Sequence, residues 1–132
     1  MNHLNEVWKE YDEWEVTHSI LHYLFAIDEL HRNKWYARAV DIANNLNITA
    51  WSCSISLKNL LKKNLILEDE NKFYSLSNKW KKIVKETIEK REVLYNFFHD
   101  KLWLDKNISN INACKLEHLI WTEVIKKIKE KF

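Results

Sequence analysis

Apolar side chains recur at helical spacing over most of the chain. Between residues 13 and 30 they stand three or four positions apart, which places them on one face of a helix. The same spacing predicts helices over residues 37–46 and 50–63, after a turn at residues 31–34. Thr49 precedes the later helix and can cap it. Two helices of these lengths joined by a tight turn are typical of a DNA-recognition unit.

The pattern changes after Asn64. Residues 65–67 and 72–76 are apolar or aromatic and flank a polar stretch, which predicts the two strands of a hairpin. A hairpin directly after a recognition helix is the wing of a winged helix-turn-helix. The expected remainder is a frayed helix over residues 1–12, a long apolar helix over 78–102, a loop over 103–109 and helices over 110–119 and 121–131.

These elements predict a mainly α protein with a small β-wing. Residues 1–77 form a winged helix-turn-helix DNA-binding domain, and residues 78–132 form an all-helical metal-binding and dimerisation domain. The helix over 78–102 carries an apolar stripe with no other obvious cover in so short a chain, which favours a two-fold dimer.

Composition limits the classes of protein. A hydrophobic content of 46% and an aromatic content of 13% argue against disorder. The chain has no apolar run of membrane-spanning length and no signal peptide, so we expect a cytoplasmic protein without a membrane partner. Its two cysteines, Cys53 and Cys114, are too few for a disulfide scaffold, and Cys53 is expected to pack in the core.

A net charge of +2 is only mildly basic, so affinity for double-stranded DNA must come from local clustering of charge. Hydroxyl and basic side chains gather around the second helix of the helix–turn–helix, where they suit phosphate and base-edge contacts. The alternative is that many of them are ordinary solvated positions. The candidate DNA-binding residues are Arg38, Thr49, Ser52, Ser54, Ser56, Lys58 and Lys62.

Three side chains near the C-terminus have the spacing of a metal site. Cys114, Glu117 and His118 stand at positions i, i+3 and i+4, which share one face of a helix. A thiolate, a carboxylate and an imidazole together can hold a divalent metal. Cys114 can equally be an ordinary buried cysteine. His31 and His99 show no such pattern and are expected to be solvated.

The order of these features resembles the diphtheria toxin repressor and manganese transport regulator family of metal-dependent repressors, in the form without an SH3-like domain. The Cys-x-x-Glu-His motif after a long helix is the specific part. The resemblance implies a homodimer that represses transcription when metal binds. It is carried by Tyr36–Ala43, Leu65–Ile66, Tyr74–Ser77, Arg91–Leu94 and Ala113–His118.

The resemblance also implies ligands. Cys114, Glu117 and His118 match the family motif, and the first-helix ligand positions fall at Ser19 and His22. An imidazole can ligate a metal, whereas Ser19 is a poor ligand. His22 can alternatively be a polar residue at a domain contact. The implied metal site is therefore His22, Cys114, Glu117 and His118.

At the family's ancillary site the chain departs from the pattern. Arg91, Tyr95 and Asn110 stand where related proteins have metal ligands, and a guanidinium cannot bind a cation. We therefore expect one metal per subunit. A thiolate ligand shifts a site away from manganese. The cofactor expected from the sequence is a divalent transition metal, with Fe²⁺ favoured and Mn²⁺ or Zn²⁺ as alternatives.

The chain contains no glycine and no proline. In related sequences glycine is usual at or near Asn64 and at four positions where this chain has tryptophan. Tryptophan does not adopt a left-handed turn cheaply. One hypothesis is that a stop codon read as glycine has been translated here as tryptophan, and the alternative is a variant with a constrained composition. The four positions are Trp35, Trp51, Trp80 and Trp103.

The sequence thus predicts a metal-dependent transcriptional repressor that controls metal homeostasis, with iron favoured. The alternative is a metal-independent winged-helix regulator, or a protein-interaction module that has lost metal sensing. An enzyme is not expected, because no nucleophile, base and orienting group converge at a recognisable spacing.

Overall fold

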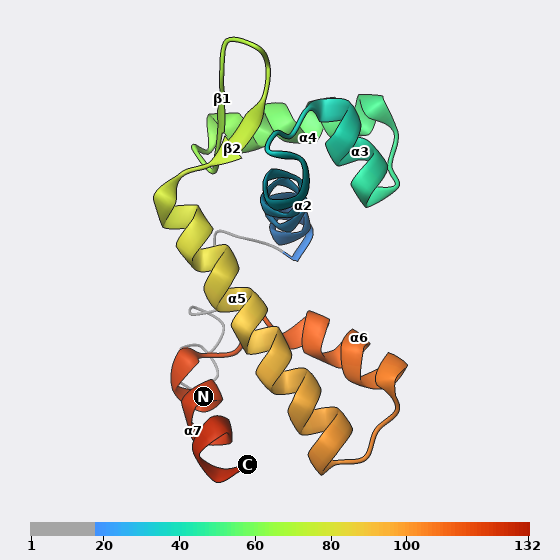
Figure 1. Cartoon of the computed structure of the whole chain (residues 1–132), viewed down its shortest axis with the longest axis vertical. Coiled ribbons are helices and arrows are strands. Elements are labelled where there is room, and N and C mark those ends of the chain that lie inside the picture. The colour runs from blue at the N-terminus through green and yellow to red at the C-terminus, as the bar shows by residue number, and fades with distance from the viewer. Residues whose placement is uncertain (1–17) are drawn as a thin grey trace, which may run out of the picture.

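The computed structural model of the chain describes residues 18–132 (Figure 1). The expected helix over residues 1–12 and the segment from 13 to 17 lie outside the described residues. Within them the predicted mainly helical class with one small antiparallel sheet is confirmed. The elements are α2 (His18–Lys34), α3 (Ala39–Leu46), α4 (Ala50–Lys62), β1 (Ile66–Glu68), β2 (Tyr74–Leu76), α5 (Asn78–Asn96), a π-helical turn (Phe97–Lys101), α6 (Lys106–Leu116) and α7 (Thr122–Lys131).

The turn between α3 and α4 follows from two side chains. Asn47 ends α3 in the left-handed conformation, with φ 55° and ψ 48°, which asparagine tolerates better than most residues. Thr49 caps α4, and its Oγ1 accepts a hydrogen bond of 3.1 Å from the backbone N–H of Ser52. The predicted helix–turn–helix segment therefore forms two helices with a short left-handed connection.

The hairpin is short and its register is fixed by burial. Ile66 pairs with Leu76, and both side chains are buried. Asp69 shapes the turn, because its Oδ1 accepts hydrogen bonds of 2.9 Å from the backbone N–H groups of Asn71 and Phe73. The wing therefore has a polar exposed tip and an apolar base.

The base of the wing is attached to the preceding helices. The backbone N–H of Tyr74 donates to the carbonyl oxygen of Ala37 over 2.7 Å. His31 Nε2 lies 2.6 Å from the carbonyl oxygen of Tyr74. The expectation that His31 is solvated was therefore wrong: this histidine joins α2 to β2.

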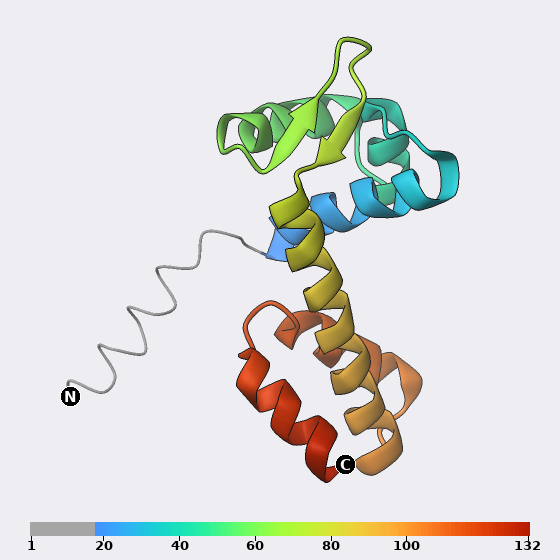
Figure 2. The same cartoon turned by 60° about the vertical axis from the view of Figure 1, so that its left-hand side comes forward.

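Helix α5 connects two separate hydrophobic clusters (Figures 1 and 2). Its first turns, with Trp80 and Val84, complete a large cluster formed with α2, α3, α4 and the hairpin. Its second half contacts α6 and α7 around Leu94, Ala113 and Ile125. The apolar stripe on this helix is therefore covered by α2, α6 and α7 of the same chain, and it does not need a second subunit as cover.

Element boundaries differ from the sequence prediction in several places, most plainly in α2 and α6. Helix α2 continues through Lys34, where a turn was expected at residues 31–34. Helix α6 begins at Lys106, inside the expected loop over 103–109, because the Asp105 carboxylate accepts a hydrogen bond of 2.8 Å from the backbone N–H of Ile108 and caps the helix. Helix α6 ends at Leu116, before the expected end at 119, so Glu117 and His118 lie beyond it.

Two tryptophans occupy left-handed backbone positions. Trp35 has φ 72° and Trp103 has φ 57°, and their side chains are 87% and 88% exposed. Trp35 follows α2 and Trp103 follows the π-helical turn, and neither side chain is buried. Trp51 is an exposed residue of α4, whereas Trp80 is buried. Of the four tryptophans at expected glycine positions, two therefore have the backbone conformation that glycine adopts most easily.

In the described part of the chain, none of the helices has the length and apolar character needed to cross a lipid bilayer.

Candidate metal centre

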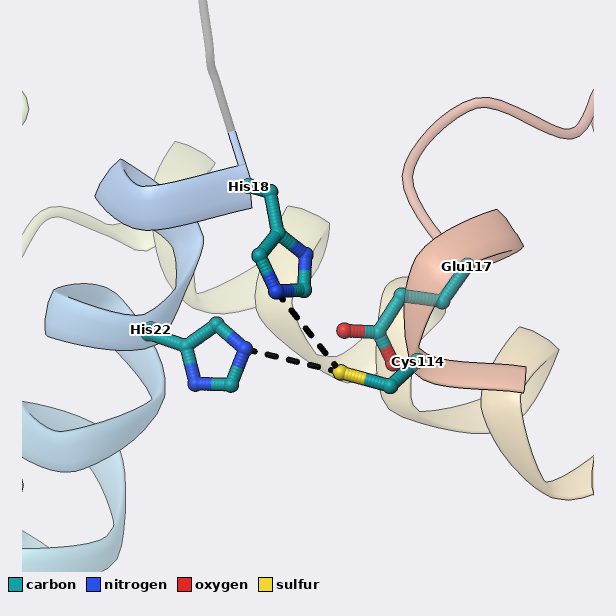
Figure 3. Close-up of side chains that lie close together, drawn as sticks. All are labelled: His18, His22, Cys114 and Glu117. Carbon is teal, nitrogen blue, oxygen red and sulfur yellow. Dashed lines mark hydrogen bonds between the residues drawn. The ribbon is translucent and has the colours of Figure 1, made fainter. Parts of the chain in front are cut away.

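Four side chains from two helices converge where the start of α2 faces the end of α6 (Figure 3). His18 and His22 stand one helical turn apart on α2. Cys114 lies in the last turn of α6, and Glu117 follows directly as the C-terminal cap residue. One donor atom from each of these residues lies within 4.8 Å of the others. Among the described residues this is the one such group of His, Cys, Asp and Glu.

The distances within this group suit a small cation. Cys114 Sγ lies 3.5 Å from His22 Nε2 and 3.9 Å from His18 Nε2. With Zn–N bonds of about 2.0–2.1 Å and a Zn–S bond of about 2.3 Å, a tetrahedral zinc places N and S about 3.6 Å apart. The imidazole and thiol groups are therefore already arranged for coordination without movement of the backbone.

Glu117 is bound to a cation of the chain itself. Its side chain is fully buried, and both carboxylate oxygens accept hydrogen bonds from Arg91 of α5, one from Nε and one from Nη2 at 2.9 Å. The Arg91 guanidinium also lies 4.8 Å from the ring centre of Phe25 on α2. Arg91 therefore contacts both sides of the centre and balances the buried carboxylate charge.

His118 lies at the edge of the group. It is 9% exposed, and its ring centre is 5.2 Å from that of His18. The Nδ1 atoms of His18 and His118 are both buried without a hydrogen-bond partner among the described residues. Buried polar atoms are normally satisfied, so these two Nδ1 atoms are open to a partner, while the His18 nitrogen that faces the Cys114 thiol is Nε2.

Electrostatics keep the ring nitrogens free for coordination. Burial and the neighbouring His18 lower the pKa of His22, and burial and His18 likewise lower the pKa of His118. Burial, together with the Glu117 charge, raises the pKa of the Cys114 thiol. At neutral pH the imidazoles of His22 and His118 are therefore uncharged donors, while a metal must displace the thiol proton.

The structure brings three of the four metal-site residues expected from the sequence into one group: His22, Cys114 and Glu117. The fourth, His118, lies beside the group. Sequence reasoning missed His18, because the family pattern directed attention to Ser19, which is exposed. The spacing of His18 and His22 by four residues was the signal that could have identified the pair.

The residues at the expected ancillary-ligand positions have other partners or are exposed. Arg91 is engaged with Glu117, Tyr95 stacks on His99 with ring centres 5.4 Å apart, and Asn110 is exposed. His99 Nδ1 also lies 2.9 Å from the carbonyl oxygen of Leu104, so the expectation that His99 is solvated was wrong.

The candidate DNA-binding residues lie in α4 or just before α3 and α4, and none of them is part of the metal group. Arg38 precedes α3 and pairs with Asp41 at 3.2 Å. Within α4, Ser54, Lys58 and Lys62 follow one another at four-residue spacing and are exposed. Thr49 and Ser52 are exposed at the start of α4, and Ser56 is half-buried.

The C-terminal part of the chain matches a known protein family. Residues 78–132 match the family described as the iron dependent repressor, metal binding and dimerisation domain. The match covers less than half of the chain. The resemblance to the metal-dependent repressors that the sequence indicated is therefore confirmed. No curated protein matches the chain.

Solved structures share the fold. The hypothetical protein SSo2273 from Sulfolobus solfataricus aligns with a TM-score of 0.69 and 20% identity, over 87% of this chain and 88% of that one. The manganese regulator SloR aligns with a TM-score of 0.71 and 23% identity, over 83% of this chain and 51% of its own. ScaR with bound Zn²⁺ aligns with a TM-score of 0.68 and 22% identity, over 83% and 51%. The chain thus spans about half the length of SloR and ScaR.

Proposed function

We propose that this chain is a homodimeric transcriptional repressor whose binding to double-stranded DNA depends on a divalent transition metal. It acts in the cytoplasm as a regulator of metal homeostasis and is not an enzyme. The observation that carries the proposal is the convergence of His18 and His22 from α2 with Cys114 and Glu117 from the end of α6. The family of the C-terminal segment supports it, as does the fold shared with ScaR, a protein solved with bound Zn²⁺.

The geometry gives metal a means to control DNA binding. Helix α2 packs against α3 and β2, so its orientation sets that of the helix–turn–helix. Cys114 and Glu117 belong to the part of the chain built around α5, α6 and α7. A metal ion supplies a bond between these two parts when it is bound. His18 and His22 then hold α2, and with it α4, in one position relative to the C-terminal part.

In this proposal residues 1–77 bind DNA and supply His18 and His22 to the metal centre, while residues 78–132 supply Cys114 and Glu117 and bind a second subunit. The proposed DNA contacts are those of α4 and the residues around it. Two copies of α4 in a two-fold dimer would enter successive major grooves, about one helical turn or 34–36 Å apart. Bound metal would fix α2 relative to the part of the chain that binds the second subunit. It would therefore favour the distance between the two α4 helices that matches two successive major grooves.

The test begins with an unbiased selection. The full chain, reduced and saturated with Zn²⁺, Fe²⁺ or Mn²⁺ in separate experiments, is used to select duplexes from a random DNA library. Affinity for the selected duplex is then measured with metal and with a chelator, for the parent and for Cys114→Ser. The proposal expects at least a 10-fold loss with chelator, and a similar loss for Cys114→Ser in the presence of metal.

Equal affinity with metal and with chelator would contradict metal control and favour a metal-independent winged-helix regulator. Failure to select any duplex under all three metals would favour the protein-interaction module.

A further inference from the structure

The donor atoms at the centre differ from the oxygen ligands that manganese prefers, and nitrogen and sulfur donors bind Zn²⁺ more tightly than Fe²⁺. Two imidazole nitrogens and one sulfur lie within coordination distance of a shared point, and among the described residues none of the three atoms has a stronger polar partner. Manganese prefers oxygen ligands, whereas imidazole and thiolate ligands suit zinc and cobalt. The Glu117 carboxylate is the one oxygen ligand in the group, so the site suits manganese only if this carboxylate binds the metal.

That carboxylate is already engaged. Both oxygens of Glu117 accept hydrogen bonds from Arg91, and the guanidinium is held in place by its packing on Phe25. A carboxylate in a bidentate pair with arginine has less charge to offer a metal. The fixed positive charge of Arg91 also opposes a second cation nearby. Glu117 thus serves mainly to position Arg91 and the end of α6.

We propose that His18 is a metal ligand and that His18, His22 and Cys114 form a nitrogen–sulfur site selective for zinc-class ions over Fe²⁺ and Mn²⁺. This inference rests on the proposed function and specifies the metal that controls it. It departs from the expectation of Fe²⁺ drawn from the sequence, which counted His22 but not His18 and treated Glu117 as an unengaged ligand. A tetrahedral ion fits the N–S separations, and the fourth position is open to His118.

Cobalt is the probe for this geometry. The reduced full chain is titrated with Co²⁺ while the visible and near-ultraviolet absorption is recorded. A tetrahedral site with a thiolate ligand gives intense d–d bands and a sulfur-to-cobalt charge-transfer band. Zn²⁺ is then added, and the loss of these bands reports the relative affinity. The expected result is an intense tetrahedral spectrum that stoichiometric Zn²⁺ removes.

Three variants assign the ligands. His18→Ala is expected to weaken Zn²⁺ binding at least about 10-fold, within the 10–100-fold range that follows from loss of metal-supporting residues. Ser19→Ala is the matched control on the neighbouring exposed position, and it is expected to bind Zn²⁺ as the parent does. Glu117→Gln is expected to reduce Zn²⁺ affinity less than His18→Ala. Circular dichroism confirms that each variant is folded before titration.

A weak octahedral spectrum without a thiolate band, or His18→Ala binding Zn²⁺ as tightly as the parent, would overturn this inference. If Mn²⁺ or Fe²⁺ still activates DNA binding in that case, the proposed repressor function stands and only the metal assignment fails. If no divalent metal changes DNA binding, the proposed function itself fails, whatever the spectra show.

Discussion

The two hydrophobic clusters of the chain differ in how completely they are enclosed. In the described residues the cluster around α2, α3 and α4 contains sixteen buried side chains, and the cluster around the end of α5 contains three. Apolar residues of α6 and α7 stay exposed, among them Ile108, Ile111 and Val124. The first region therefore has the larger enclosed core, while the second leaves apolar side chains of α6 and α7 exposed.

The largest expected effect is on the free energy of unfolding, when one buried leucine from each cluster is replaced by alanine. Leu24 is 0% exposed and Leu94 is 2% exposed. We expect Leu24→Ala to lower the free energy of unfolding by about 3–5 kcal/mol, because tightly enclosed cavities collapse poorly. We expect Leu94→Ala to lower the free energy of unfolding by less, about 2 kcal/mol, because the smaller cluster around Leu94 can relax into the cavity. Urea denaturation of the two variants measures both values, and equal losses would contradict the difference in enclosure.

The next effect concerns subunit contacts. If the exposed apolar side chains of α6 form part of the dimer interface, Ile111→Glu should weaken the dimer by roughly 2 kcal/mol, about 30-fold in dissociation constant. Leu67→Glu is the control, because Leu67 is exposed on the wing and should leave association unchanged. Sedimentation at several concentrations measures both. An Ile111→Glu protein as dimeric as the parent would place the interface elsewhere.

A smaller effect belongs to the first region alone. Lys58→Ala with Lys62→Ala removes two exposed charges from one face of α4. Each lost phosphate contact lowers the slope of log affinity against log salt by about 0.9, so the pair should lower it by about 1.8. Dimerisation should not change. An unaltered slope would remove these lysines from the interface with DNA.

The smallest effect is shared by both regions. Trp35 and Trp103 hold left-handed backbone conformations and are almost fully exposed. Replacing either with glycine should raise the free energy of unfolding by about 1 kcal/mol, because the steric cost of a side chain in that conformation disappears. Trp51→Gly is the control within α4, where glycine should destabilise by about 0.5 kcal/mol. The codons offer a separate check, since ordinary tryptophan codons at all four positions, Trp35, Trp51, Trp80 and Trp103, would exclude the translation hypothesis.

Periodicity in the sequence was sufficient for the fold class and for most helices, because each helix packs one apolar stripe against the chain. Boundaries that depend on a single cap were missed: Asp105 starts α6 earlier than the apolar pattern does. At the metal centre the Cys-x-x-Glu-His spacing identified the α6 side. The four-residue spacing of His18 and His22 marks a pair on one face of α2, but only the way α2 meets α6 shows that this pair lies beside Cys114.

The role of Arg91 shows the same limit. From the sequence it was expected only to remove a second metal site. Its ion pair with Glu117 and its contact with Phe25 emerge from the packing of α2, α5 and α6 together. Long-range side-chain contacts of this kind determine which donors are available to a metal.

The proposed function requires that metal and DNA binding are coupled through α2. The most direct measurement is the affinity of the reduced protein for Zn²⁺ with and without its selected duplex. Coupling is reciprocal, so the factor by which metal strengthens DNA binding must equal the factor by which DNA strengthens metal binding. We predict at least 10-fold tighter Zn²⁺ binding in the presence of the duplex. An unchanged Zn²⁺ affinity would contradict the coupling and show that the metal centre is structural.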